Sequence, residues 1–237
     1  SGKDLSFASF HYTSFDNADM ENTNLTGAEL VQVDFTKIKN KSLAGTNLLD
    51  TSFAHSNLSG VNLSGSTLDA NNFFNANLSG LDFSVISNTS MRGVIFPDAN
   101  LSNANFEGVS LFDNIIYGIT IEGDAGSADR SLTELTGRYF SEWKNKLVVG
   151  KQVIGNDLQI QFIYLTNFSN TNLQNANFSN ADLRFSGFYE ADLTNADLSG
   201  ADLTKAFLGE ADLSNANLDG AILDNAVLTC KNHPVCN

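Results

Sequence analysis

The sequence predicts an all-β solenoid in which the chain turns a corner every five residues, with one helical insertion. Two observations predict it: a large apolar residue recurs at every fifth position along most of the 237 residues, and small and polar residues keep fixed places around it. A period of five matches neither the 3.6-residue period of an α-helix nor the simple alternation of a long strand. Short sides that each send one large and one small side chain inward explain it, because together they fill a narrow interior.

Four runs of large apolar residues carry this period. Every fifth residue is Leu, Phe, Ile or Met in the runs Leu5–Phe35, Leu43–Phe83, Met91–Ile121 and Leu158–Leu228. In the last run a small residue, usually Ala, stands two positions before the apolar centre. Asp or Asn commonly stands just before the centre, and Ser or Thr just after it. These polar residues suit corners, because they bond to nearby backbone and tolerate turn dihedrals.

The segment 191–195, Ala-Asp-Leu-Thr-Asn, shows the complete unit. Its pattern of Ala, Asp or Asn, and Leu, followed by two variable residues, resembles that of the pentapeptide-repeat family. The resemblance covers most of the chain and implies a right-handed quadrilateral β-helix with four repeats per coil. Residues twenty apart would then stack on neighbouring coils, and backbone hydrogen bonds would join each coil to the next.

Breaks in the period divide the chain into three parts. N-terminal β-helix coils are expected at 1–121, an insertion at 122–157, and C-terminal coils with an end cap at 158–237. A regular repeat is enough to build a rigid coil. Residues that recognise a specific partner are therefore expected at the breaks in the repeat.

Within the insertion, an amphipathic helix is expected over about 130–146, because apolar residues recur there at three- and four-residue spacing. Ser131 and Glu134 form a capping-box signature at its start. Tyr, Trp and Arg dominate interface hot spots, so exposed residues of these types would suit a partner. The candidates for partner contact are Arg138, Tyr139, Trp143 and Lys144. The alternative is that this helix only docks its apolar residues on the coil.

A second basic segment interrupts the coils earlier, between Phe35 and Leu43. It adds the candidate partner-binding residues Lys37, Lys39 and Lys41. With four repeats per coil, this break and the large insertion lie a whole number of coils apart, so both should leave the same corner. Their basic residues would then line one edge of an otherwise acidic body.

The acidic residues form the other candidate surface. The formal net charge of −14 repels nucleic acid and anionic lipid and suits basic partners. The stacking rule places Glu190 next to Glu210, and Asp192 next to Asp212, in one acidic patch. One interpretation is ordinary solubility chemistry at outward positions, which we favour. The other is an acidic face that mimics a nucleic-acid backbone or receives a basic partner.

The two cysteines, Cys230 and Cys236, lie close together in the sequence, with His233 between them. A disulfide loop that staples the last turn, or a pair of reduced thiols, is favoured over a zinc site. Structural zinc usually takes four ligands, and this segment offers three.

No catalytic constellation is evident in the sequence. The histidines stand at 11, 55 and 233 without a nucleophile at motif spacing, and no phosphate-binding loop appears. Outward carboxylates on a convex surface lack the shielded cleft that general acid–base pairs need. The sequence therefore predicts neither catalysis nor a cofactor, and any catalytic domain would lie outside this chain.

The favoured function is a protein-recognition scaffold that binds another protein and does not bind nucleic acid directly. Some secreted bacterial effectors that resemble this chain place such a β-helix ahead of a HECT-like ubiquitin-ligase domain, where it would recognise a partner or substrate. A DNA-mimicking binder of a topoisomerase such as gyrase, like the quinolone-resistance members of the family, is the alternative. A purely structural rod is a third. No apolar run approaches the ~20 residues needed to span a bilayer, and the compartment stays open between the bacterial cytoplasm and a host cell.

Overall fold

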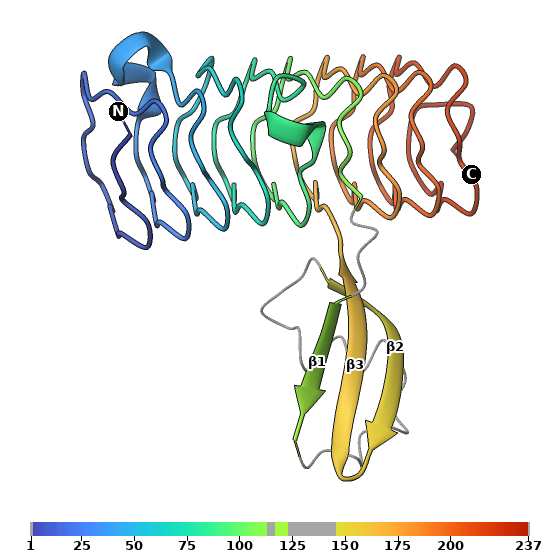
Figure 1. Cartoon of the computed structure of the whole chain (residues 1–237). Coiled ribbons are helices and arrows are strands. Elements are labelled where there is room, and N and C mark those ends of the chain that lie inside the picture. Colours follow the sequence, from blue (N-terminus) through green and yellow to red (C-terminus); the bar gives the residue numbers. More distant parts are fainter. Residues whose placement is uncertain (1, 113–116, 123–145, 237) are drawn as a thin grey trace. The chain divides into compact units, whose positions relative to one another are not determined.

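The computed structural model describes residues 2–112, 117–122 and 146–236, drawn in colour in Figure 1. The chain forms two compact units. Ser1–Phe112 and Thr166–Asn237 together make the first, and Asp113–Leu165 make the second.

In the first unit, the chain winds as a stack of four-sided coils (Figure 1). Parallel bridges join each side to the same side of the next coil, at a separation of 20 residues, as in Asp192–Asp212. The separation is 23 where a coil carries three extra residues, as in Asn24–Asn47. A separation of twenty is the one expected for four sides of five residues.

We name the four faces of this coil A to D in chain order and define each by its bridging residues. Near the C-terminal end, face A carries Ser110, Asp182, Asp202 and Ile222; face B carries Asn167, Gly187, Phe207 and Val227; face C carries Asn172, Asp192, Asp212 and Lys231; and face D carries Asn177, Asp197 and Asn217.

The corners explain why the repeat needs polar residues and glycine. At a representative corner, the Ala196 N–H donates to the Leu193 carbonyl over 2.9 Å, which closes a four-residue turn. Asn195, its third residue, has a φ of 57°. Type II turns require a positive φ there, which Gly and Asn adopt at least cost. The Asp192 carboxylate accepts the Thr194 N–H over 3.0 Å, so the polar residue before the centre also stabilises the corner.

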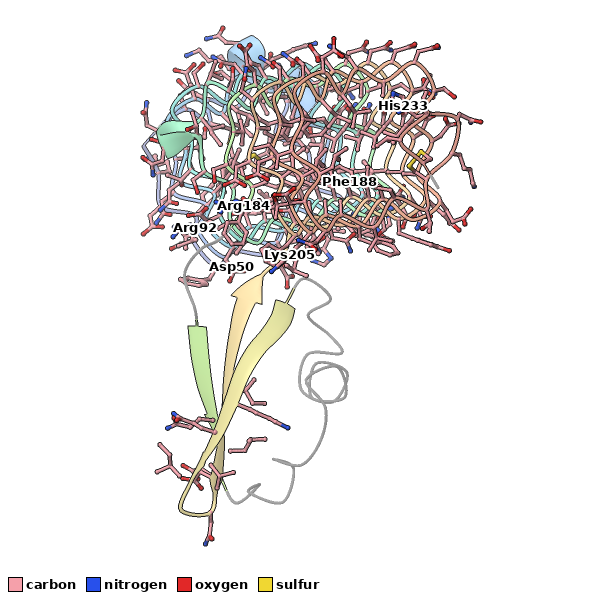
Figure 2. All side chains as sticks on the ribbon, turned by 90° about the vertical axis from the view of Figure 1, so that its right-hand side faces the viewer. Asp50, Arg92, Arg184, Phe188, Lys205 and His233 are labelled. Carbon is pink, nitrogen blue, oxygen red and sulfur yellow. A yellow bond between two sulfur atoms is a disulfide. The ribbon has the colours of Figure 1, made fainter. Side chains whose placement is uncertain are left out.

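Large apolar side chains fill the coil interior and stack from coil to coil. On face B, the Phe168 ring lies 5.0 Å from Phe96 and 4.9 Å from Phe188, and both pairs are stacked. Figure 2 labels Phe188 inside the coil, while nitrogen and oxygen atoms lie mainly at its periphery. The small position beside most centres is also buried, as Ala196 shows. Where that position is Thr171, its hydroxyl donates to the Phe96 carbonyl over 2.7 Å.

Short 3-10 helices absorb the two smaller breaks in the period. η1 (Phe35–Lys37) and η2 (Lys39–Lys41) lie between faces C and D. η3 (Ser87–Thr89) lies between faces D and A. The residue between η1 and η2, Ile38, is buried at 4% exposure, so the extra residues still contribute to the core.

The expectation that the first break and the large insertion leave the same corner is wrong. The first break lies between faces C and D, whereas the insertion follows Leu111 on face A, and the coil resumes with Phe168 on face B. The five-residue spacing counts Ile116 and Ile121 as two further sides of the coil, but both residues belong to the second unit. The first break and the insertion therefore leave the coil at different corners.

The second unit contains an antiparallel sheet of β1 (Tyr117–Ile121), β2 (Lys146–Ile154) and β3 (Asp157–Tyr164), in the order β1-β3-β2. β2 and β3 form a hairpin in which Ile154 pairs with Asp157. Gly155, in the two-residue turn, has a φ of 65°, which suits glycine.

This sheet corrects the expected limits of the coils. Leu158 and Ile163 lie in β3, so the C-terminal coils begin at Thr166 and not at 158. Most of the helix expected over 130–146 lies outside the described residues, and Lys146 is the first residue of β2. Among the residues that the structure describes, no helix has the length and apolar character to cross a membrane.

Candidate functional site

The four predicted acidic residues come together in a shallow groove on the last coils. It has a volume of about 460 Å³ and is lined by Asn170, Glu190, Ala191, Asp192, Glu210, Asp212 and Lys231. Asp192 and Asp212 bridge on face C, as the stacking rule predicts. Glu190 and Glu210 occupy successive corner positions between faces B and C, with φ values of 55° and 58°. The fold thus concentrates four carboxylates at one corner.

Hydrogen bonds orient the carboxylates of this groove. Asp212 accepts from the Ser214 hydroxyl over 2.6 Å and from the Asn232 side-chain amide over 3.0 Å. The Ser214 bond, followed by the Asn232 bond, lowers the pKa of Asp212. Asp192 accepts from the Gln174 side-chain amide over 2.6 Å.

One cation of the same chain lies in the groove. Lys231 Nζ is 2.9 Å from Glu210 Oε2, and both side chains are about half exposed. The hydrogen bond that Lys231 donates to Glu210 raises the pKa of Lys231, and the charges of Glu210, Glu190 and Asp212 act in the same direction. Sequence reasoning missed Lys231, because the period of five breaks after Leu228 and Lys231 takes the place of a repeat residue on face C.

An exposed apolar strip adjoins the groove. We use this name for Tyr189, Phe207 and Val227, which are 41%, 42% and 42% exposed. Phe207 and Val227 bridge on face B, and the Tyr189 and Phe207 rings stack with centroids 6.1 Å apart. A hydrogen bond to Glu190 raises the pKa of Tyr189, so this residue joins the strip to the groove.

Gly209 leaves room for the Phe207 ring in the middle of the apolar strip. A Cβ atom at position 209 would lie 2.6 Å from the Phe207 ring. Gly209 therefore allows the ring to lie over the backbone and present its outer face to solvent. The sequence signal that reveals the strip is a departure from the repeat: Phe207 and Val227 stand just before their centres, where Asn, Asp, Ser or Thr is usual.

Comparison with protein families gives a match to the model for pentapeptide repeats. It has eight copies, over residues 4–39, 42–69, 52–84, 72–111, 165–200 and 191–229. The chain belongs to the pentapeptide-repeat family. Membership implies a right-handed β-helix. A search of curated protein sequences gave no significant match.

Several solved pentapeptide-repeat structures are similar to this chain. HetL from the cyanobacterium Nostoc sp. strain PCC 7120, involved in heterocyst differentiation regulation, is 20% identical, with 93% of this chain and 89% of that chain covered and a TM-score of 0.30. Full-length QnrB1, a plasmid-mediated fluoroquinolone resistance protein, is 15% identical, with 94% and 92% covered and a TM-score of 0.36. Rfr23 from the cyanobacterium Cyanothece 51142 is 17% identical, with 79% and 91% covered and a TM-score of 0.36.

The basic candidates of the pentapeptide coil lie away from this groove. Lys37 Nζ is 3.4 Å from Asp34, and Lys39 Nζ is 3.0 Å from Asp19, in exposed ion pairs. Lys41, the third of them, is exposed on η2. Arg138, Tyr139, Trp143 and Lys144, the candidates of the insertion, lie outside the described residues.

The cysteine segment forms the C-terminal cap of the pentapeptide coil. Cys230 and Cys236 are joined by a disulfide, and Val235 packs on the core. His233 Nδ1 accepts the Val235 N–H over 3.2 Å. Across the described part of the chain, no three potential metal ligands gather at one place.

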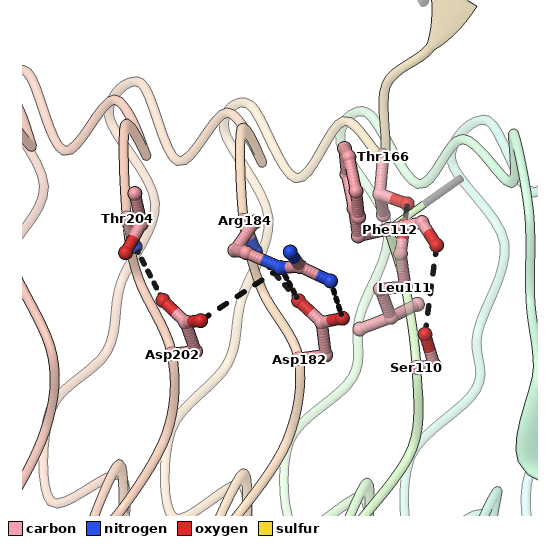
Figure 3. Close-up of polar contacts among 8 residues, drawn as sticks. All are labelled: Ser110, Leu111, Phe112, Thr166, Asp182, Arg184, Asp202 and Thr204. Atoms are coloured by element: carbon pink, nitrogen blue, oxygen red, sulfur yellow. Dashed lines mark hydrogen bonds and ion pairs between the residues drawn. The ribbon is translucent and has the colours of Figure 1, made fainter. Parts of the chain in front are cut away.

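A cluster of an arginine, aspartates and a phenylalanine lies on the pentapeptide coil beside the point where the insertion begins (Figure 3). Arg184 Nε and Nη2 donate to the two Asp182 oxygens over 2.8 and 2.7 Å, and Asp202 lies 3.7 Å away. The bonds to Asp182 raise the pKa of Arg184. The guanidinium also lies 4.3 Å from the centroid of the Phe112 ring. Thr166, at the other end of the insertion, donates its hydroxyl to the Leu111 carbonyl over 2.8 Å.

Proposed function

We propose that this pentapeptide-repeat protein is a recognition scaffold that binds another protein through the apolar strip and the acidic groove. The observation that carries the proposal is the alignment of Tyr189, Phe207 and Val227 on adjacent coils, at about 40% exposure each. Exposed apolar patches rimmed by polar residues mark interaction sites. Phe207 and Val227 also occupy bridging positions that carry Asn or Asp in many other repeats.

The electrostatics of the surface favour binding over proton transfer. Where the pKa of a carboxyl group in the C-terminal coils shifts, it falls: hydrogen bonds from Ser199 lower the pKa of Asp197, and bonds from Ser214 and Asn232 lower that of Asp212. A general acid at neutral pH needs a raised carboxyl pKa. Carboxylates that are charged at neutral pH instead suit the steering and orientation of a partner.

A capture experiment with matched variants tests the scaffold function. Phe207→Asn with Val227→Asn restores the usual polar residues of the repeat, so we expect the coil to fold and the partner to be lost. Leu49→Ser with Phe74→Ser removes two exposed apolar residues of the N-terminal coils and serves as the control. Equal capture of the same partner by both double variants would contradict the proposal, and capture of none by the wild-type chain would favour a purely structural rod.

The proposed setting, as the recognition module of a bacterial effector with a HECT-like ligase domain, rests on the sequence resemblance alone. A DNA-mimicking topoisomerase binder is the second candidate, and the stacked pairs Asp182–Asp202 and Asp192–Asp212 favour it. Arg184 and Lys231 weaken this candidate, because they partly neutralise the two clusters. If it is right, the chain inhibits gyrase supercoiling and Asp192→Asn with Asp212→Asn abolishes the effect.

A further inference from the structure

The charges around the apolar strip indicate which kind of protein segment it accepts. On the groove side, the strip borders on Glu190 and Glu210, and the aspartates of face C lie just beyond. Lys231 is the one cation lining this groove, against four carboxylates. Complementary potentials favour a partner that brings positive charge to this rim.

Lys231 shows where such a charge would lie. Its ammonium group contacts Glu210 over 2.9 Å, and the negative charges of Glu190 and Asp212 also act on it. The lysine and glutamate side chains are 53% and 51% exposed. An exposed ion pair of this kind contributes little to stability, so another cation can replace it at small cost.

Tyr189 contacts both the apolar strip and the acidic groove. Its ring stacks with Phe207, and its hydroxyl is held by Glu190. A segment that covers Phe207 and Val227 with apolar side chains therefore has a carboxylate pair within reach of the neighbouring residue. Lysine and arginine side chains can lay their apolar stems along the Tyr189 ring while the charged group reaches the carboxylates.

Building on the proposed function, we propose that the surface binds a polypeptide segment in which lysine or arginine alternates with apolar residues. Its cation displaces Lys231 from Glu210, and its apolar side chains cover Phe207 and Val227. In the free protein, Lys231 is thus an internal competitor. Its removal should strengthen binding, whereas the loss of any other surface lysine should not.

Fluorescence anisotropy with the whole chain and a labelled peptide, acetyl-Lys-Leu-Lys-Leu-Lys-Leu-amide, tests the proposal. We expect Lys231→Gln to bind it several-fold more tightly than wild type, and Glu190→Gln with Glu210→Gln to bind it about tenfold more weakly. Asp98→Asn with Glu107→Gln changes the net charge equally at exposed positions away from the groove and serves as the control. Lys41→Gln is the matching control for Lys231.

Three results of the anisotropy experiment would overturn the proposal. They are equal losses in the groove pair and the control pair, equal gains in Lys231→Gln and Lys41→Gln, and equal affinity for the peptide with Glu in place of Lys. Concentration-dependent self-association that is lost in Phe207→Asn would assign the surface to a second copy of this chain and would also overturn it. The capture experiment is read separately: a captured partner that needs Phe207 and Val227, with no preference for the basic peptide, keeps the scaffold function and rejects only the basic segment.

Discussion

At the residue scale, the position just before each apolar centre has two uses. Where it is Asp or Asn, the side chain accepts the backbone N–H two residues on, as Asp197 does from Ser199 over 3.0 Å. It also bonds to the next coil, as the Asn217 amide does to Asp197 over 3.1 Å. Where it is Phe207 or Val227, these bonds are given up and apolar surface is exposed. This exchange of polar for apolar residues distinguishes face B of the last coils, the surface for which we propose a binding role.

The aspartates that accept a hydrogen bond from the residue two positions on make the stability of the fold depend on pH. The pKa values of Asp4, Asp34, Asp197 and Asp212 are all lowered, chiefly by hydrogen bonds from the Ser or Thr two residues on. A lowered pKa in the folded state means that the stabilisation is complete above the unfolded value of about 3.9 and is lost as pH falls through the folded value. We therefore expect urea midpoints that are flat from pH 7 to 5 and fall below about pH 4.

Asp197→Asn with Asp212→Asn should make this acid dependence shallower, because Asn keeps the acceptor oxygen without titrating. The measurement is the urea midpoint of both proteins at each pH. An unchanged slope in the variant would show that other groups control the acid transition.

At the element scale, each coil depends on its neighbours, and the last coil depends on the disulfide segment. The Lys231 N–H donates to the Ala211 carbonyl over 2.8 Å, and the Leu213 N–H donates to the Lys231 carbonyl over 3.0 Å. Lys231 thus completes face C after the five-residue period has ended. The same segment carries Asn232, which bonds to Asp212 in the groove.

Replacing both cysteines by serine should loosen this segment. A native disulfide contributes on the order of 2 kcal/mol, and in a repeat protein the effect stays near the affected coil. We expect faster hydrogen exchange at Leu213 and Lys231, with the exchange at Leu101 unchanged as an internal control. Uniformly faster exchange along the whole coil would contradict a local role.

At the scale of the whole molecule, the coil and the insertion are separable in the chain. Leu111 and Phe168 are centres of consecutive sides, and the stacked rings of Phe96 and Phe168 show that the core continues across the insertion. The binding surface proposed here belongs entirely to the coil.

Deleting residues 114–165 joins Asp113 to Thr166 and restores the five-residue step between Leu111 and Phe168. Asp113 would occupy a corner position that requires a positive φ, which Asp tolerates better than most residues. We expect a folded coil that binds the basic peptide with unchanged affinity, measured by circular dichroism and anisotropy. Loss of peptide binding by a folded deletion variant would place part of the surface on the insertion.

The sequence by itself determined the repeat, the buried residues and the acidic stacking, because each follows from a local rule applied every five residues. It did not determine where the coil stops. Ile121, Leu158 and Ile163 keep the five-residue spacing, yet they lie in β1 and β3. The alternation of apolar residues in these strands accounts for Ile121 and Leu158. The sequence signal that distinguishes the β-hairpin from the coil is the Gly155–Asn156 turn between two apolar runs.

Only the tertiary structure decided which other residues share a surface with the acidic stack. The corner at which a segment leaves the coil depends on the number of sides that precede it. Two wrongly counted sides therefore placed the insertion at the wrong corner. Lys231 enters the acidic groove only because the capped end of the chain completes face C. Tyr189 and Phe207 are eighteen residues apart and meet because neighbouring coils stack. Two residues on neighbouring coils meet only if the number of residues between them completes one turn of the coil. Each break or insertion changes that number, and the five-residue pattern does not show by how much.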